Sequence, residues 1–142
     1  MPQAVIDASF ALSWAAPDEQ ASLDARGILA ALHGGEIRLL APSLWEYEVA
    51  NALRMGVARK RLTEEEASKA LRWLLDLGIN LRGFGPICHR AWELALEHDL
   101  AVYDAAYLAL AEQRRCPLYT NDTRLAHAAR RVGLMGHLGE GG

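Results

Sequence analysis

The chain has 142 residues, 51% of them hydrophobic and 23% charged, and a formal net charge of −3. These values are typical of a single globular domain with a substantial core, and they exclude a protein that coats nucleic acid by bulk positive charge. No apolar stretch is long enough to cross a bilayer, and the N-terminus lacks a signal-peptide pattern, so we expect a cytoplasmic protein. The two cysteines, Cys88 and Cys116, indicate reduced thiols rather than a disulfide framework.

The chain opens with a predicted strand and two predicted helices. Residues 4–6 form a short apolar run that predicts a buried strand, and Asp7 closes this run. A short helix follows over 9–15. A proline and two acidic residues then predict the start of a second helix over 17–33, which two glycines end. Residues 37–41 predict the next strand.

Ser43 and Glu46 form a capping-box pattern, which predicts a helix over 43–59. One broad face of this helix is apolar, and Glu48 falls inside that face. A carboxylate in an apolar stripe is costly unless it is paired or bound to a metal. Glu48 is therefore either a functional residue or a charge that reaches solvent at the margin of the stripe. The apolar face comprises Leu44, Trp45, Val49, Ala52 and Met55.

Thr63 and Glu66 repeat the capping-box pattern and predict a helix that ends at Gly78. Residues 79–84 predict a weaker strand, in which polar and apolar residues alternate as at a sheet edge. A helix over 85–97 follows. The residues of the Thr63 helix that we expect to face inward are Ala67, Leu71, Leu74 and Leu75.

The last third of the chain predicts two further helices and two strands. A helix that begins at Asp104 is apolar nearly all round, so we expect it to be buried on most sides. Residues 117–120 predict a fourth strand, and Asp122 follows it. A helix over 123–132 and a short fifth strand at 134–135 complete the chain.

Strands that alternate with helices predict a parallel sheet with helices on both faces, in one domain over 1–138 followed by a loose tail at 139–142. Ligands of such sheets collect at the carboxyl ends of the strands, where Asp7 and Asp122 stand. Asp104 lies at the positive N-terminal end of a buried helix. Each of these three residues also has an ordinary explanation as a helix N-cap, and the residues alone leave both interpretations open.

Four segments of the chain together resemble the PIN-domain family, and in particular its VapC-type toxin ribonucleases. The segments stand in the family's order and spacing, and the resemblance covers essentially the whole chain. No single segment is specific, but the combination is. They are residues 5–9 (VIDAS), 42–51 (PSLWEYEVAN), 103–111 (YDAAYLALA) and 119–125 (YTNDTRL).

The resemblance implies an α/β fold, a three-layer α/β/α sandwich with a central parallel sheet in the order 3-2-1-4-5. It implies an endoribonuclease that hydrolyses RNA with Mg²⁺ or Mn²⁺ and leaves a 5′-phosphate and a 3′-hydroxyl. The implied partners are the RNA substrate, a VapB-type antitoxin and a second copy of the chain in a homodimer. Ser9, Thr120 and Asn121 would support the site. The acidic residues at the family's metal-binding positions are Asp7, Glu48, Asp104 and Asp122.

Elementary electrostatics supports a metal site without the resemblance. Four carboxylates about 6 Å apart would repel by roughly 3 kcal/mol per pair at an effective dielectric of about 20. The six pairs would exceed the ~5–15 kcal/mol stability of a typical domain, so either the groups are protonated or cations lie between them. Mg²⁺ and Mn²⁺ suit such oxygen ligands and can activate a water. We expect Asp7, Asp104 and Asp122 to be ligands, and Glu48 to be a ligand or the base that orients the water.

Contacts to an RNA backbone require basic side chains. The densest basic cluster lies where the helix of Glu48 ends, and the helix dipole explains it at least as well. Trp14 and Tyr103 could stack on a base, but core packing explains them better. The five histidines have no metal-ligand spacing, so we assign them structural roles. The basic cluster comprises Arg54, Arg59, Lys60 and Arg61.

Three other functions compete with a nuclease. A phosphoacceptor receiver domain would need a lysine at a late strand exit, but Lys60 and Lys69 stand in or beside helices. A haloacid-dehalogenase-type phosphatase would need a second Asp where Ser9 stands. The serious alternative is a catalytically weak PIN-fold module that binds or regulates a protein partner, and metal binding would discriminate between that module and the enzyme.

Overall fold

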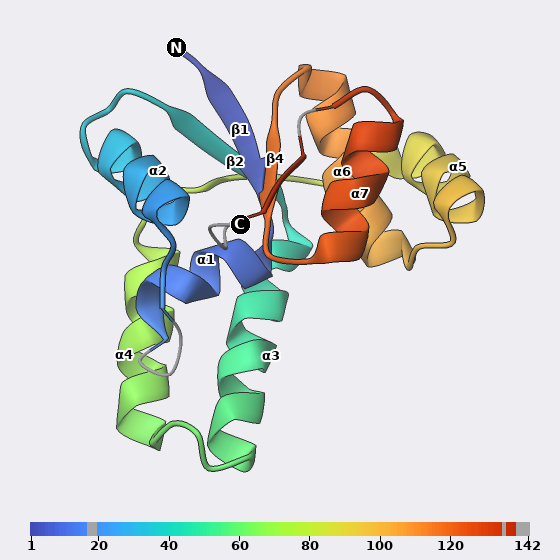
Figure 1. Ribbon diagram of the computed structural model, residues 1–142. Coiled ribbons are helices and arrows are strands. Elements are labelled where there is room, and N and C mark those ends of the chain that lie inside the picture. Colours follow the sequence, from blue (N-terminus) through green and yellow to red (C-terminus); the bar gives the residue numbers. More distant parts are fainter. Residues whose placement is uncertain (17–19, 135, 139–142) are drawn as a thin grey trace.

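Five parallel strands form a single sheet, in the order β3 (Asn80–Arg82), β2 (Arg38–Pro42), β1 (Gln3–Ile6), β4 (Leu118–Thr120) and β5 (Gly136–Leu138) (Figure 1). The computed structural model describes residues 1–16 and 20–134 and the backbone of 136–138. β1 occupies the centre, where Val5 pairs with Leu40 of β2 and with Leu118 of β4. The order and direction of the strands confirm the predicted sheet.

The helices form two groups on opposite sides of the sheet (Figure 1). Between β1 and β3 the chain forms α1 (Ala8–Ala15), α2 (Leu23–His33), α3 (Leu44–Ala58) and α4 (Glu64–Leu75). After β3 it forms a short 3-10 helix, η1 (Gly85–Ile87), and then α5 (Cys88–His98), α6 (Val102–Arg114) and α7 (Thr123–Arg131). This arrangement confirms the predicted α/β/α sandwich. None of the helices in the described ranges has both the length and the apolar character needed to span a membrane.

The core extends over both faces of the sheet, and one large part of it lies between the sheet and α6. Residues 4–6 of β1 are completely buried, as expected for a parallel strand that is covered on both faces. Residues 105–111 of α6 are also buried, and this helix contacts β1, β2 and β4. The prediction of a helix buried on most sides is therefore confirmed. Cys88 and Cys116 are free thiols.

β1 and β4 are neighbours in the sheet although β2 and β3 separate them in sequence. The winding direction reverses between them, so their carboxyl ends meet at one point of the sheet edge. Ile6 pairs with Tyr119, and the backbone N–H of Asp7 donates to the carbonyl of Tyr119 at 3.2 Å. This pairing places Asp7 beside the segment that leads from β4 to Asp122.

Only one of the two predicted capping boxes is present. At α4 the Thr63 hydroxyl accepts from the N–H of Glu66 at 3.0 Å, and the Glu66 carboxylate accepts from the N–H of Thr63 at 2.9 Å. At α3 the prediction is wrong, because Ser43 makes no side-chain cap bond and its backbone is already helical, at φ −58° and ψ −24°. A capping side chain needs an extended backbone to reach the N–H groups of the helix. The N–H of Ser43 donates to the carbonyl of Arg82 at 2.8 Å instead, so pairing with β3 sets the backbone here.

Two helices begin elsewhere than predicted. α2 begins at Leu23 rather than at Pro17, because the Ser22 hydroxyl caps it by accepting from the N–H of Ala25 at 3.1 Å. Residues 17–19 themselves lie outside the described residues. α6 begins at Val102, two residues before the predicted start at Asp104.

The fifth strand and two inward-facing positions also differ from the predictions. β5 occupies Gly136–Leu138 rather than 134–135, while Met135 and the expected tail at 139–142 lie outside the described residues. Met55 is 37% exposed and Leu75 is 45% exposed, because each lies near the margin of its helix face. Leu53 is buried on α3 instead.

We expect the two capping serine and threonine positions to differ in their effect on stability. Thr63→Ala removes a cap that is present, so the free energy of unfolding should fall by about 1 kcal/mol. Ser43→Ala removes no cap and should change it by less than about 0.5 kcal/mol. Urea denaturation of both variants measures the difference, and equal losses would contradict the capping geometry.

Candidate active site

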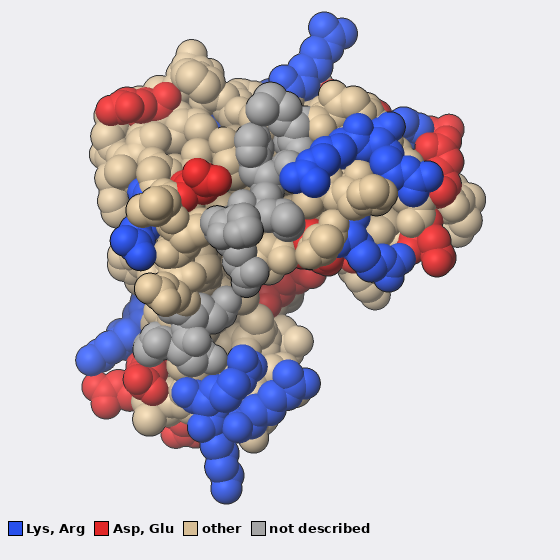
Figure 2. Space-filling model, viewed as in Figure 1, with Lys and Arg blue, Asp and Glu red and all other residues tan. Residues whose placement is uncertain are grey.

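Four elements bring the four predicted carboxylates to the carboxyl edge of the sheet. Asp7 follows β1, Asp122 follows β4, Glu48 lies on the second turn of α3, and Asp104 lies on the first turn of α6. Figure 2 shows acidic side chains between the start of α3 and the start of α7.

Asp7 is the most buried of these carboxylates, with 6% of its surface exposed. Its Oδ1 accepts from the Ser9 hydroxyl at 2.8 Å and from the backbone N–H of Phe10 at 2.9 Å. Its Oδ2 accepts from the Thr120 hydroxyl. Asp7 therefore caps α1, as the ordinary interpretation had it, and is also joined to β4 by a side-chain bond.

Ser9, Thr120 and Asn121 connect the two strand ends around Asp7. The Thr120 hydroxyl oxygen also accepts from the N–H of Asp122 at 2.9 Å. The Ser9 hydroxyl oxygen accepts from the N–H of Asn121 at 3.0 Å, and the Asn121 amide donates to the carbonyl of Ser9 at 3.2 Å. The three residues that the sequence assigned to support thus lie in one hydrogen-bond network with Asp7.

Asp122 caps a helix, whereas Asp104 does not. Asp122 caps α7, since its Oδ1 accepts from the N–H of Arg124 at 2.9 Å and from that of Leu125 at 3.4 Å. Asp104 is not a cap, because Ala101 occupies the N-cap position of α6. Asp104 is half-buried inside the first helical turn. The capping explanation therefore holds for Asp122 but not for Asp104.

Glu48 is half-buried and bonded to a tyrosine of α6. The Tyr107 hydroxyl donates to Glu48 Oε1 at 2.6 Å. Tyr107 is buried, and burial together with the negative charge of Glu48 raises its pKa far above the usual range, so it remains a hydrogen-bond donor. Glu48 is therefore not a charge that escapes to solvent at the margin of an apolar stripe.

Three of the carboxylates, Asp7, Glu48 and Asp104, have raised pKa values. Burial and, to a smaller extent, the negative charge of Asp122 raise the pKa of Asp7 to about 6 against three opposing hydrogen bonds. Burial also raises the pKa of Asp104, with a contribution from Asp122, and the pKa of Glu48, with a contribution from Asp104. Arg124 opposes the shift of Asp104. The four groups therefore form an electrostatic chain in the order Asp7, Asp122, Asp104, Glu48.

This chain is less repulsive than the estimate from the sequence, which assumed that all pairs lie equally close. In the part of the chain that the structure describes, the only carboxylate charge that raises the pKa of Asp7, of Asp104 or of Glu48 is that of a neighbour in this order. The donor set consists of carboxylate oxygens with little positive charge near them, which fits a hard divalent cation. Among the described residues, no three acidic, histidine or cysteine side chains are already drawn together closely enough to hold a metal. The chemistry of the donors fits Mg²⁺ or Mn²⁺, whereas a finished ligand cage is absent from these residues.

Comparison with known proteins identifies the family. The PIN domain family matches residues 4–131, which is most of the chain. The chain belongs to the PIN-domain family.

Curated relatives of this PIN domain carry the name VapC ribonuclease. Ribonuclease VapC3 from Pyrobaculum aerophilum is 36% identical over 124 residues, covering 86% of this chain and 91% of the relative. Ribonuclease VapC1 from Mycobacterium tuberculosis is 35% identical over 129 residues, covering 90% of this chain and 92% of the relative. These matches confirm the resemblance to the VapC-type branch.

Two solved structures share the fold of this PIN domain. PAE2754 from Pyrobaculum aerophilum superposes with a TM-score of 0.70 at 24% identity, over 96% of this chain and 83% of its own. VapC20 from Mycobacterium tuberculosis, described as a toxin that cleaves the sarcin-ricin loop, gives a TM-score of 0.60 at 18% identity, over 88% of this chain and 94% of its own. At these identities the likeness concerns the fold alone.

The basic cluster predicted for RNA contacts lies apart from the carboxylates. Its members are exposed and gather where α3 ends and the chain turns into α4 (Figure 2). Glu48 and Arg59 are separated by about 16 Å along the helix axis, at about 1.5 Å per residue. The structure therefore does not bring the cluster into the site, and its contact with RNA stays a prediction. Its members are Arg54, Arg59, Lys60 and Arg61.

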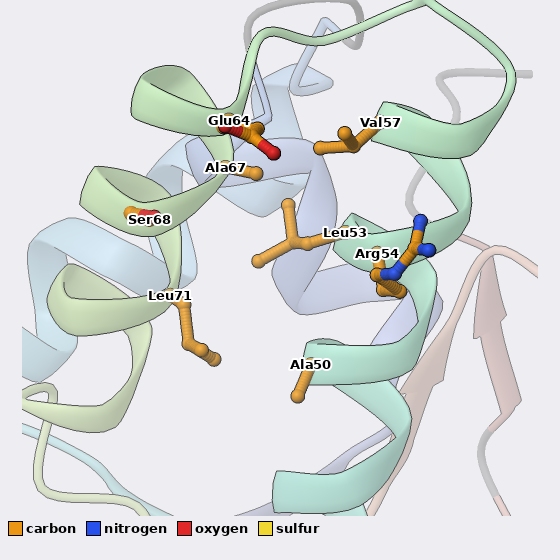
Figure 3. Close-up of a pocket in the computed structure, with 8 residues that line it drawn as sticks. All are labelled: Ala50, Leu53, Arg54, Val57, Glu64, Ala67, Ser68 and Leu71. Atoms are coloured by element: carbon orange, nitrogen blue, oxygen red, sulfur yellow. The ribbon is translucent and has the colours of Figure 1, made fainter.

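One member of this basic cluster, Arg54, lines a groove between α3 and α4. The groove has a volume of about 560 Å³, and Arg54 lines it from α3 while Glu64 lines it from α4 (Figure 3). The remaining lining is mostly apolar. None of the four carboxylates lines this groove, so it is separate from the acidic site. The other lining residues are Ala50, Leu53, Val57, Ala67, Ser68 and Leu71.

The two aromatic residues considered for base stacking have different environments. Trp14 is half-buried and its indole N–H donates to the carbonyl of Ala25 at 2.7 Å, which confirms core packing. Tyr103 is 65% exposed, so the expectation of core packing is wrong for this residue. It lies on the outer side of the first turn of α6, whose buried face carries Ala105 and Ala106.

The sequence interpretation missed two residues of the site, Tyr107 and Arg124. Both stand inside the family segments, but neither received a role. Tyr107 lies three positions after Asp104 in an apolar helix, and a buried phenol usually requires a hydrogen-bond partner, which was a usable signal. Arg124 donates through its guanidinium to the carbonyl of Asp99 at 2.5 Å, a contact between distant segments that no local pattern indicates.

We expect Asp7 to make the stability of the metal-free protein depend on pH. Its pKa in the folded state, about 6, lies above its ordinary value of 3.8. Asp7 therefore contributes stability that is fully present below about pH 4 and is lost as the pH rises through about 6. Asp7→Asn has no such group to ionise. Between about pH 4 and about pH 7.5, its free energy of unfolding should therefore rise by about 3 kcal/mol relative to that of wild type. Urea denaturation in EDTA measures this difference, and parallel pH profiles for the two proteins would contradict it.

Proposed function

We propose that this PIN domain is a metal-dependent endoribonuclease that hydrolyses RNA phosphodiester bonds as the toxin of a toxin–antitoxin pair. One observation carries the proposal: four carboxylates from separate elements form an electrostatic chain where the carboxyl ends of β1 and β4 meet. A fold gains no stability from such mutual repulsion, so the arrangement favours a role in binding cations. The names of the curated relatives support RNA as the substrate.

Asp7, Asp104 and Asp122 would hold Mg²⁺ or Mn²⁺ directly or through water. Such an ion, when bound, supplies a Lewis acid beside the phosphodiester and lowers the pKa of a bound water. Glu48 would act as a further ligand or as the base that orients this water. Hydrolysis of the phosphodiester would leave a 5′-phosphate and a 3′-hydroxyl. Ser9, Thr120 and Asn121, taken together, would keep Asp7 aligned with Asp122 through the hydrogen bonds around them.

The proposed partners follow from the same assignment. The RNA backbone would contact the basic cluster at the end of α3, so bound RNA would extend from the carboxylates along that helix. A VapB-type antitoxin would restrain the enzyme, two copies of the chain would form a homodimer, and the protein would act in the cytoplasm. We propose one domain over 1–138 as the catalytic unit.

We expect purified protein to cleave RNA with Mg²⁺ or Mn²⁺ and to lose this activity in EDTA. Asp7→Asn and Asp104→Asn should each reduce the rate by about 100-fold or more, because each removes a proposed charged ligand. Cleavage of single-stranded and structured RNA, resolved on gels, measures the rates. Asp76→Asn is the matched control: Asp76 is exposed at the end of α4, and this variant should cleave like wild type.

Titration calorimetry with Mn²⁺ separates the enzyme from a catalytically weak binding module. Wild type should bind Mn²⁺, and Asp104→Asn should bind it more weakly. Equal cleavage by the variants and wild type would refute the site. The absence of both cleavage and Mn²⁺ binding would favour the binding module.

We expect a neighbouring gene product to neutralise the toxin. Expression of this chain alone should arrest growth, and Asp104→Asn should relieve the arrest because the ribonuclease activity is lost. Coexpression with the product of the upstream reading frame should restore growth, and the two proteins should copurify. Arrest that persists in Asp104→Asn would show that RNA hydrolysis is not its cause.

A further inference from the structure

Glu48 receives a hydrogen bond that its own helix does not supply. The Tyr107 hydroxyl donates to Glu48 Oε1 at 2.6 Å, and only 1% of the Tyr107 surface is exposed. The two residues are 59 positions apart in sequence, on α6 and α3. This bond links the helix that carries Asp104 to the helix that carries Glu48.

Tyr107 lies on the side of α6 that faces the carboxylates. Residues three apart lie on the same side of a helix, so Tyr107 and Asp104 share one side of α6. Asp104 is in turn close enough to Glu48 to interact with it electrostatically. The structure shows no salt bridge to Glu48 within the described ranges, so the phenol is the contact that orients this carboxylate.

A half-buried glutamate without such a donor would be free to adopt several side-chain rotamers. The bond from Tyr107 occupies Oε1 and restricts the carboxylate to the rotamers that reach the phenol. Oε2 then remains available for a water or a cation. The phenol is itself buried among apolar residues and has no solvent to compete with this bond.

We propose that Tyr107 is a positioning residue for the reaction, which holds Glu48 by Oε1 and presents Oε2 to the site. This inference rests on the proposed function, since it assigns Glu48 a part in RNA hydrolysis. Packing alone does not explain the hydroxyl, because the ring of a phenylalanine would fill the same space. Removal of the hydroxyl group alone therefore tests the proposed role of Tyr107.

Tyr107→Phe should lower kcat by about 10- to 100-fold, the effect of losing a hydrogen bond to a charged group. KM for RNA should stay within about twofold, because the ring and the RNA contacts are retained. In a Glu48→Ala background the same substitution should change kcat by less than about twofold, since Tyr107 acts through Glu48. Steady-state kinetics on wild type, both single variants and the double variant measure this coupling.

Tyr47→Phe is the matched control, because it removes the same atom from a tyrosine that is 78% exposed and adjacent to Glu48 in sequence. Its kcat should stay within about twofold of wild type. An equal loss from Tyr107→Phe in the wild-type and Glu48→Ala backgrounds would overturn the proposal, and so would a rise in KM at unchanged kcat.

Urea denaturation without metal tests the contact between Tyr107 and Glu48 independently of activity. It is measured on wild type, Tyr107→Phe, Glu48→Ala and the double variant. The two substitutions should be non-additive, because they remove the two ends of one bond. Additive effects would overturn the proposal. A wild-type protein that binds no Mn²⁺ and cleaves no RNA would refute the proposed function and the catalytic role of Tyr107 together, and coupling seen only in denaturation would then mark a purely structural contact.

Discussion

A nearly solvent-free carboxylate at the junction of two strands is the constraint on which the site depends. Asp7 lies at the end of β1 and accepts hydrogen bonds from Ser9, Phe10 and Thr120. The Thr120 hydroxyl oxygen also accepts from the N–H of Asp122, so a single hydroxyl connects both acidic strand ends. A buried carboxylate is costly when these bonds are missing. A shift in the pairing of β1 with β4 would therefore leave Oδ2 of Asp7 without its donor, so this polar contact reinforces the register of the two strands.

The fold accepts a local destabilisation at this edge and offsets it elsewhere. Burial and neighbouring negative charges raise the pKa values of Asp7, Glu48 and Asp104. Within the described part of the chain, only Asp104 of these three residues has a nearby arginine, Arg124, that lowers its pKa. The opposing stability comes from the completely buried residues 4–6 of β1 and from α6, whose residues 105–111 pack across the sheet. Because α6 carries Asp104 on its first turn, the element that supplies much of the core also delivers a carboxylate to the site. Such a division between a stable scaffold and an electrostatically destabilised site is typical of enzymes.

Much of the fold and the acidic positions were predictable from local patterns. The strand order followed from the family segments, while alternation of strands and helices indicated a parallel sheet and short runs such as 4–6 located its strands. The capping box at Thr63 was predictable because both partners lie within one turn. The equivalent pattern at Ser43 failed, since a bond to Arg82 of β3 sets the backbone there. Helix faces were predicted less well at their margins, because exposure at Met55 depends on which neighbouring helix covers that position.

The sequence by itself determined the kinds of groups in this protein and their places at the ends of elements: carboxylates after two strands and on two helices, and an apolar helix able to fill the core. These features depend on neighbours within a few residues, which a sequence displays directly. Only the tertiary structure decided how the groups pair. It joined Tyr107 to Glu48 and Thr120 to Asp7, and it placed the basic end of α3 away from the carboxylates. Hydrogen bonds and Coulomb interactions depend on distance in space, and the distance between residues far apart in the chain is set only when the helices and the sheet pack together.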